Sequence, residues 1–204
     1  MKKGRVTASM CKACCGAGSP NAKVKRIITV GSPTAEPCSV HMQYGLENED
    51  KACEMFASQM EAVHIRKCGL FVCAEHGQLA ASPDRVGEIA GERVVVEVKC
   101  LSGSRTMSPS EAVAQRQSKS DFAFRMVNKK ISLKERHTYF YQVQMQMGIT
   151  GIHTAYVVVF THEGVPVEWT KVMFDTGFWN KKKEKLLDFH SQYVVPALVA
   201  QRFG

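Results

Sequence analysis

The stretch 82-SPDRVGEIAGERVVVEVKC-100 contains a run of valines typical of a buried strand, yet it also carries charged residues within that run. Successive side chains of a strand point to opposite faces, so the valines at even positions form one face, and Glu97 and Lys99 share the other. The pattern predicts a strand whose valine face is buried and whose second face presents a carboxylate beside an ammonium group. For this strand alone, a solvated ion pair is the alternative.

Asp84 adds a second carboxylate to the same unit. It follows Pro83 at the end of a strand predicted near 78–82, and a hairpin with the turn AGE would bring it alongside Glu97. Two converging carboxylates repel each other unless a cation lies between them. Mg²⁺ prefers a few carboxylates together with water and phosphate oxygens. The hairpin therefore predicts a magnesium site, with Lys99 beside the metal-bound water.

A helix predicted at about 42–60 carries a further candidate. On a helical wheel, Glu49 falls on the apolar face formed by Leu46, Cys53, Phe56 and Met60. Burial of an uncompensated charge is costly. Glu49 is therefore interpreted as a metal ligand, and the alternative is a residue at the edge of the stripe that reaches solvent.

A second helix, predicted at about 137–148, has two stripes. Phe140, Val143 and Met147 form an apolar stripe that predicts the core face. Tyr139 and Gln142, with Gln146, form a polar stripe. This stripe either faces solvent or faces a phosphate and an attacking water.

The remaining elements predict an α/β fold with a central mixed β-sheet flanked by helices. Strands are expected near 70–74, at 154–162 and at 167–174, a capped helix from Ser108, a long loop over 16–38 and a polar, basic segment over 104–136. We expect one domain over 1–204, with a core at about 40–175 and a C-terminal helix at about 178–200.

The chain has a formal net charge of +8, concentrated in NAKVKR, NKKISLKER and WNKKKEKL. Such patches favour a polyanionic partner such as nucleic acid, and solubility is the alternative. The chain lacks an apolar run long enough to span a bilayer, and its basic start is not followed by the apolar core of a signal peptide. We therefore expect an intracellular protein, in the cytoplasm or nucleus, that is neither secreted nor membrane-bound.

The eight cysteines are scattered, which predicts reduced thiols. Cys11, Cys14 and Cys15 have helical spacing after Ser9, a candidate N-cap, so a core stripe is the preferred interpretation. A zinc site that also uses Cys38 and His41 is the alternative.

Several motifs, taken in order, resemble the phage lambda-type (YqaJ-like) alkaline exonucleases of the PD-(D/E)-x-K nuclease superfamily. They are GRVTAS (4–9), GLENEDKACEMF (45–56), SPD (82–84), EVKC (97–100) and YFYQVQMQMGITG (139–151). Two positions depart from the family pattern, which usually has Gly at Arg85 and Arg at Lys2. The resemblance implies a restriction-endonuclease-like core.

The resemblance also implies residue roles. Asp84 and Glu97, with the backbone carbonyl of Val98, would bind one metal, and Glu49 would help to hold the metals. Lys99 would be the catalytic lysine, and Tyr139 and Gln142 would line the site. A terminal phosphate would be bound by Ser9 with Lys2 or Arg5. Basic residues would grip the DNA backbone, namely Lys129, Lys130, Lys134 and Arg136.

The function implied is a metal-dependent 5′→3′ exonuclease that degrades one strand of linear double-stranded DNA in recombination or repair. Two Mg²⁺ ions per site are expected, with Mn²⁺ as a substitute. The expected partners are DNA ends, a single-strand annealing protein and further copies of the chain. The alternatives are an endonuclease of the same superfamily and a non-catalytic module that binds DNA ends.

Overall fold

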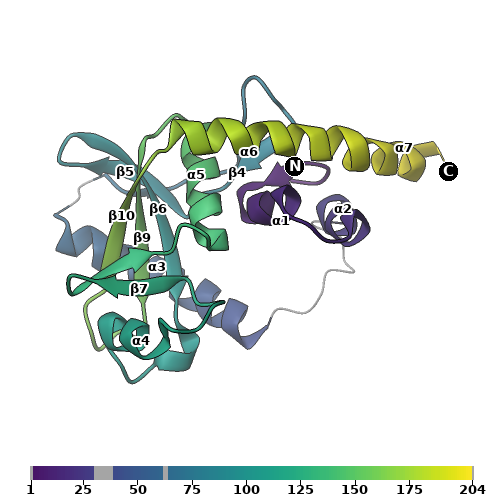
Figure 1. Ribbon diagram of the computed structural model, residues 1–204. Coiled ribbons are helices and arrows are strands. Elements are labelled where there is room, and N and C mark those ends of the chain that lie inside the picture. The colour runs from purple at the N-terminus through teal and green to yellow at the C-terminus, as the bar shows by residue number, and fades with distance from the viewer. Residues whose placement is uncertain (1, 30–38, 62–63, 204) are drawn as a thin grey trace.

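The computed structural model describes residues 2–29, 39–61 and 64–203 (Figure 1). Its centre is a five-stranded sheet in the order β10, β9, β6, β5, β2, whose strands span Glu168–Met173, Thr154–Phe160, Glu92–Cys100, Arg85–Ile89 and Arg66–Lys67. The β6 and β9 strands run parallel, and the other neighbours pair antiparallel. The predicted α/β fold with a mixed sheet is confirmed.

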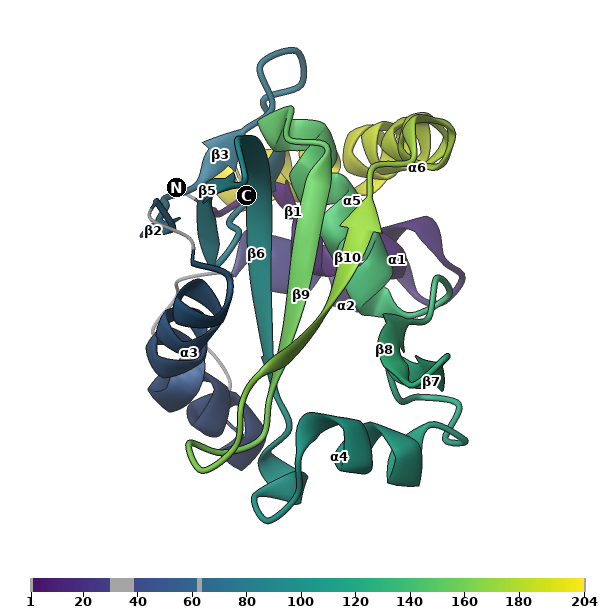
Figure 2. The same cartoon turned by 90° about the vertical axis from the view of Figure 1, so that its left-hand side faces the viewer.

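Helices cover both faces of this sheet, with α3 (Val40–Gln59) on one side and α5 (Thr138–Thr150) on the other (Figure 2). Val94, Val96 and Val98 pack into the cluster that includes Phe56 of α3. Val95, on the opposite face, packs with residues of α5. Both faces of β6 are therefore buried, and the charged pair at its end lies under a helix.

A parallel connection joins β6 to β9 by way of α5. Between them lie α4 (Pro109–Arg116) and the hairpin of β7 (Phe124–Val127) and β8 (Lys130–Leu133). The α4 helix begins with a capping box, in which the Ser108 side chain accepts from the backbone N–H of Glu111 and the Glu111 carboxylate accepts from that of Ser108.

The N-terminal segment forms a small layer beside the sheet. Its elements are β1 (Val6–Thr7), the 3₁₀ turn Ala8–Met10, α1 (Cys11–Cys15) and α2 (Pro20–Ile28). The β1 strand joins a second sheet in the order β1, β4 (Leu79–Ala81), β3 (Phe71–Val72).

The C-terminal helices run alongside this layer as α6 (Thr176–Phe189), a π-helical turn (His190–Val194) and α7 (Val195–Phe203) (Figure 1). The Nε2 of His190, a buried residue, lies 2.9 Å from the carbonyl oxygen of Gly4. The two ends of the described chain are thus joined in the core.

Several sequence expectations were wrong in detail. The strand that pairs with β6 is β5, after Asp84, because Arg85, Gly87 and Glu88 interrupt the apolar alternation that reveals a strand. The predicted loop over 16–38 contains α2, whose start at Pro20 is compatible with the first turn of a helix. The segment 30–38, with Cys38, lies outside the described residues.

Two predictions on individual helices also fail. Leu46 was placed on the buried face of its helix and is 70% exposed, since the buried face runs instead through Asn48, Ala52 and Phe56. Ser9 lies inside the 3₁₀ turn and caps no helix, because the turn already begins after Thr7.

The predicted core stripe of cysteines is confirmed, since Cys11 and Cys14 are buried and Cys15 packs against the same cluster. The cysteines in the described part of the chain are free thiols. Within that part, every helix is too short or too polar to cross a membrane.

We expect Gly148→Ala to destabilise the fold, because a Cβ at this position of α5 would lie 2.5 Å from the indole ring of Trp179, which is buried. Overpacking of this kind costs about 1–3 kcal/mol in the free energy of unfolding, which urea denaturation measures. Gly45→Ala is the matched control. Its Cβ meets open space within α3, so it should stabilise the protein by about 1 kcal/mol. Equal effects of the two changes would contradict the packing argument.

Candidate active site

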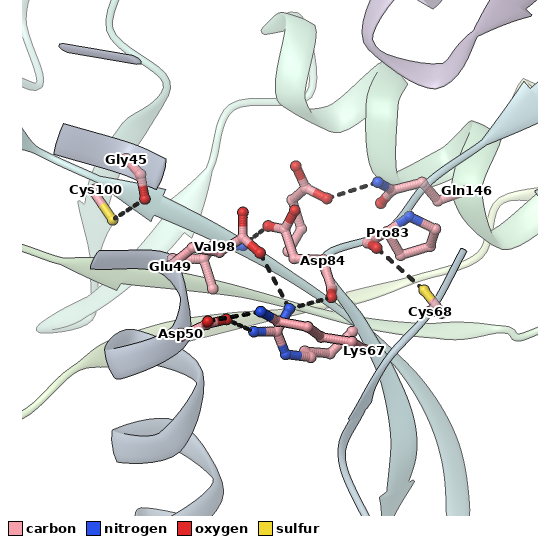
Figure 3. Close-up of polar contacts among 12 residues, drawn as sticks. Gly45, Glu49, Asp50, Lys67, Cys68, Pro83, Asp84, Val98, Cys100 and Gln146 are labelled. Atoms are coloured by element: carbon pink, nitrogen blue, oxygen red, sulfur yellow. Dashed lines mark hydrogen bonds and ion pairs between the residues drawn. The ribbon is translucent and has the colours of Figure 1, made fainter. Parts of the chain in front are cut away.

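The register of β5 on β6 places Asp84 beside Glu97. Arg85 pairs with Val96, so the residues preceding and following them meet at the end of the hairpin. The Oδ2 atom of Asp84 accepts the backbone N–H of Val98 at 2.7 Å (Figure 3). The structure thus brings together the two carboxylates that the sequence singled out.

Glu97 is 3% exposed and is surrounded by donors. Its Oε1 accepts from the Lys99 ammonium at 2.7 Å and from the Gln142 amide at 2.5 Å. Its Oε2 accepts from the Gln146 amide at 2.7 Å. The Lys99 ammonium also lies over the Tyr139 ring, 4.3 Å from its centre. The polar stripe of α5 therefore faces the carboxylate and not bulk solvent.

Burial shapes the charges of the site. Desolvation and then the negative charge of Glu97 raise the pKa of Asp84 to about 8. Burial disfavours the charged form of Lys99, but Glu97, Tyr139 and Asp84 together outweigh it and raise the pKa of that ammonium group. The Asp84 carboxylate therefore faces the negative charge of Glu97, and a cation bound between the two would relieve the repulsion.

The chemistry of these donors fits one Mg²⁺ ion. This cation takes one or two carboxylates and completes its shell with water and phosphate oxygens. Gln146 Oε1 is buried beside the pair without a hydrogen-bond partner in the described structure, so an acceptor is still open there. Within residues 2–29, 39–61 and 64–203, no three Asp, Glu, His or Cys side chains gather closely enough to form a metal cluster by themselves.

Glu49 lies beside the pair but is engaged elsewhere. Its Oε1 accepts from the Arg85 guanidinium at 3.1 Å, and its side chain is 31% exposed. Asp50, the next residue of α3, also pairs with Arg85 and with Lys67 (Figure 3). The sequence pointed to Glu49, but it did not indicate that Arg85 would be its partner.

A pocket of about 240 Å³ adjoins the carboxylates on the N-terminal side. Its walls include Lys2, Arg5, Ser9 and, from the opposite side, Gln142. Arg26 of α2 also lines it. The sequence did not point to Arg26, because α2 lies in the stretch interpreted as a loop. The basic patch NAKVKR next to Pro20 was the feature that could have indicated a cation at the site.

A second pocket, of about 460 Å³, also borders the site. Tyr139 belongs to its wall, together with the cations Arg116 and Lys119 and the imidazole of His137. Tyr139 contacts Lys99 and Gln142 contacts Glu97, so each pocket has in its wall a residue that touches the charged pair.

The predicted basic segment lies on and after the β7–β8 hairpin. Lys129, Lys130 and Arg136 are exposed. The Lys134 ammonium instead donates to the carbonyl oxygens of Gln117 and Lys119, and so ties the hairpin to the end of α4.

Comparisons with known proteins agree with this architecture. The sequence model of the YqaJ-like viral recombinase domain matches residues 1–153. A crystal structure of the alkaline exonuclease LHK-Exo from Laribacter hongkongensis superposes with a TM-score of 0.70 at 17% identity, covering 98% of this chain and 93% of that one. No curated protein sequence matches.

Two further structures share the fold. A phage-related exonuclease from Haemophilus somnus 129PT has a TM-score of 0.65 at 12% identity, over 97% of this chain and 96% of that one. The protein of a SOX–DNA complex has a TM-score of 0.58 at 15% identity, over 94% of this chain and 65% of that one.

We expect Gln146→Leu to destabilise the protein by about 1–3 kcal/mol, because it leaves an oxygen of the buried Glu97 carboxylate without its amide donor. Gln142→Leu is the matched control and should cost less, since Glu97 Oε1 keeps the Lys99 ammonium. Urea denaturation of both variants in chelator checks the order. A larger loss for Gln142→Leu would contradict this account of the Glu97 contacts.

Proposed function

The chain belongs to the family of YqaJ-like viral recombinase domains, and on that premise we propose that it is a DNA exonuclease that degrades one strand of linear duplex DNA from the 5′ end with the help of a divalent metal. Family membership and the shared fold of alkaline exonucleases support a deoxyribonuclease. The structural observation that carries the proposal is the convergence of Asp84, Glu97 and Lys99 at the end of one hairpin.

Asp84 and Glu97 would hold Mg²⁺, or Mn²⁺ in its place, with the backbone carbonyl of Val98. The bound metal would supply positive charge to the scissile phosphate and make a water molecule more acidic. Gln142 and Gln146 keep the Glu97 carboxylate in one orientation. The Lys99 ammonium, fixed by Glu97, can orient the attacking water and stabilise negative charge on the phosphate oxygens.

The two pockets that border the site support the proposed direction of digestion. The smaller one has Lys2, Arg5 and Arg26 in its walls, with the exposed hydroxyl of Ser9, and can receive a terminal phosphate. The next phosphate along the strand would then lie at Asp84 and Glu97, and the strand would continue into the larger pocket. Binding of the first phosphate thereby selects the 5′ end.

The exposed basic residues Lys129, Lys130 and Arg136 would grip the duplex backbone without reading its sequence. Membership of a family of viral recombinase domains supports a role in recombination. In that role, the 3′ overhang left by digestion would pass to a single-strand annealing protein.

Linear and circular forms of one duplex separate this proposal from its alternatives. An exonuclease degrades only the linear form in Mg²⁺, an endonuclease of the same superfamily cuts both, and a module that binds DNA ends cuts neither. Cutting of the closed circle would overturn the exonuclease proposal.

Asp84→Asn and Glu97→Gln should each lower the rate of digestion by several orders of magnitude, because each removes a carboxylate charge that would hold the metal. Both replacements keep the side-chain size, so circular dichroism should show an unchanged fold. Removing the metal from the unmodified protein with a chelator should have the same effect. Digestion by either variant at a rate near that of the unmodified protein would rule out this metal site.

We expect Arg26→Gln and Ser9→Ala to erase most of the preference for a 5′-phosphorylated over a 5′-hydroxyl end. The physical reason is that a terminal phosphate carries more negative charge than an internal one, and these residues line its pocket. Initial rates on the two substrates measure the preference. Lys3→Gln, which changes an exposed cation outside the pocket wall, should retain it. Equal rates on both ends in the unmodified protein would refute the assignment.

A further inference from the structure

Arg85 is a buried arginine beside the active site that the proposed chemistry does not use. It opens β5 directly after Asp84, and its side chain is 7% exposed. Its cross-strand partner is Val96, which packs toward α3, so the Arg85 side chain lies on the α3 face of the sheet. Glu97 and Lys99 occupy the opposite face. A buried guanidinium at this position requires partners of its own.

The Arg85 guanidinium joins the helix to the strand. Its Nη1 donates to Glu49 Oε1 at 3.1 Å and to the backbone carbonyl of Asp84 at 2.6 Å. Its Nη2 pairs with the carboxylate of Asp50. Hydrogen bonds between ionised groups are the strong ones, and the planar fork of arginine loses less freedom in making them than lysine would.

These contacts affect which carboxylates remain available to a metal ion. Glu49 is neutralised by a cation that stays charged at every pH a protein experiences. A second divalent ion bound by Glu49 would share one carboxylate group with the Arg85 guanidinium. The two positive charges would then lie close together and repel each other. In the parts of the chain that the structure describes, Glu49 does not join Asp84 and Glu97 in a three-residue metal cluster.

We propose that Arg85 is a positioning residue that engages Glu49 and holds the backbone of Asp84, so that the site binds one divalent ion per chain, at Asp84 and Glu97, instead of the two expected from the family resemblance. This inference rests on the proposed function, because it presumes a metal at that pair. The Arg85 guanidinium neutralises the negative charge of Glu49, which a second metal ion would otherwise do.

The test counts bound Mn²⁺ by electron paramagnetic resonance. The full chain is measured alone and in complex with a 5′-phosphorylated duplex whose terminal linkage resists hydrolysis. The unmodified protein should bind one Mn²⁺ in both states. Arg85→Gln, which removes the charge and frees Glu49, should bind two in the complex. Two ions in the unmodified protein, or one in a folded Arg85→Gln variant, would overturn the proposal.

Two further variants show whether Glu49 holds the second ion. Arg85→Gln combined with Glu49→Gln should return the count to one, because the freed carboxylate is then absent. Lys67→Gln is the matched control: Lys67 pairs with Asp50 at 2.7 Å but has no contact with Glu49 among its hydrogen bonds and ion pairs in the described structure. Its count should stay at one, and a count of two would overturn the assignment to Arg85.

The proposal stays testable if Arg85→Gln does not fold. Glu49→Gln in the unmodified background removes the charge of a half-buried carboxylate and keeps the size of the side chain. It should keep one bound Mn²⁺ with an affinity within about twofold of the unmodified protein, and loss of the ion would refute the proposal. Failure of the proposed function has a different signature, since neither bound Mn²⁺ nor digestion of linear duplex would then be seen. Digestion of linear duplex together with two bound Mn²⁺ ions would contradict this inference and leave the proposed exonuclease function intact.

Discussion

The buried carboxylate of Glu97 is the constraint around which the site is arranged. A charge this far from water is costly unless donors replace its hydration. Lys99, Gln142 and Gln146 supply those donors from β6 and α5. The parallel step from β6 to β9 requires a crossover, and α5 forms it. The helix that satisfies Glu97 is therefore the helix that the sheet topology demands.

Asp84, in contrast to Glu97, has few donors around its carboxylate. It receives one backbone N–H, from Val98, and faces the negative charge of Glu97. Removal of this repulsion by mutation would stabilise the metal-free fold at the expense of the site, as is common where function requires strained electrostatics. Glu97 is held by its donors, whereas the proposed metal would offset the repulsion at Asp84.

The sequence predicted the elements whose pattern is local. The β6 strand is a run of valines, α4 carries its capping box, and the polar stripe of α5 is visible at helical spacing. The β5 strand was missed because its Arg, Gly and Glu residues conceal the alternation, and α2 because the stretch around it is rich in Gly, Pro, Ser and Lys, which favours a loop. The contact between Arg85 and Glu49 joins residues 36 positions apart. No local pattern encodes such a pair, since only the packing of α3 on the sheet brings them together.

The contact between His190 and Gly4 links the pocket lined by Ser9 to the C-terminal helices. The two residues are 186 positions apart, so packing between distant segments shapes the wall of this pocket. The carboxylate pair, in contrast, lies on one hairpin of the central sheet. Damage to the C-terminal helices would therefore disturb the proposed binding of a DNA terminus before it disturbed the proposed metal site.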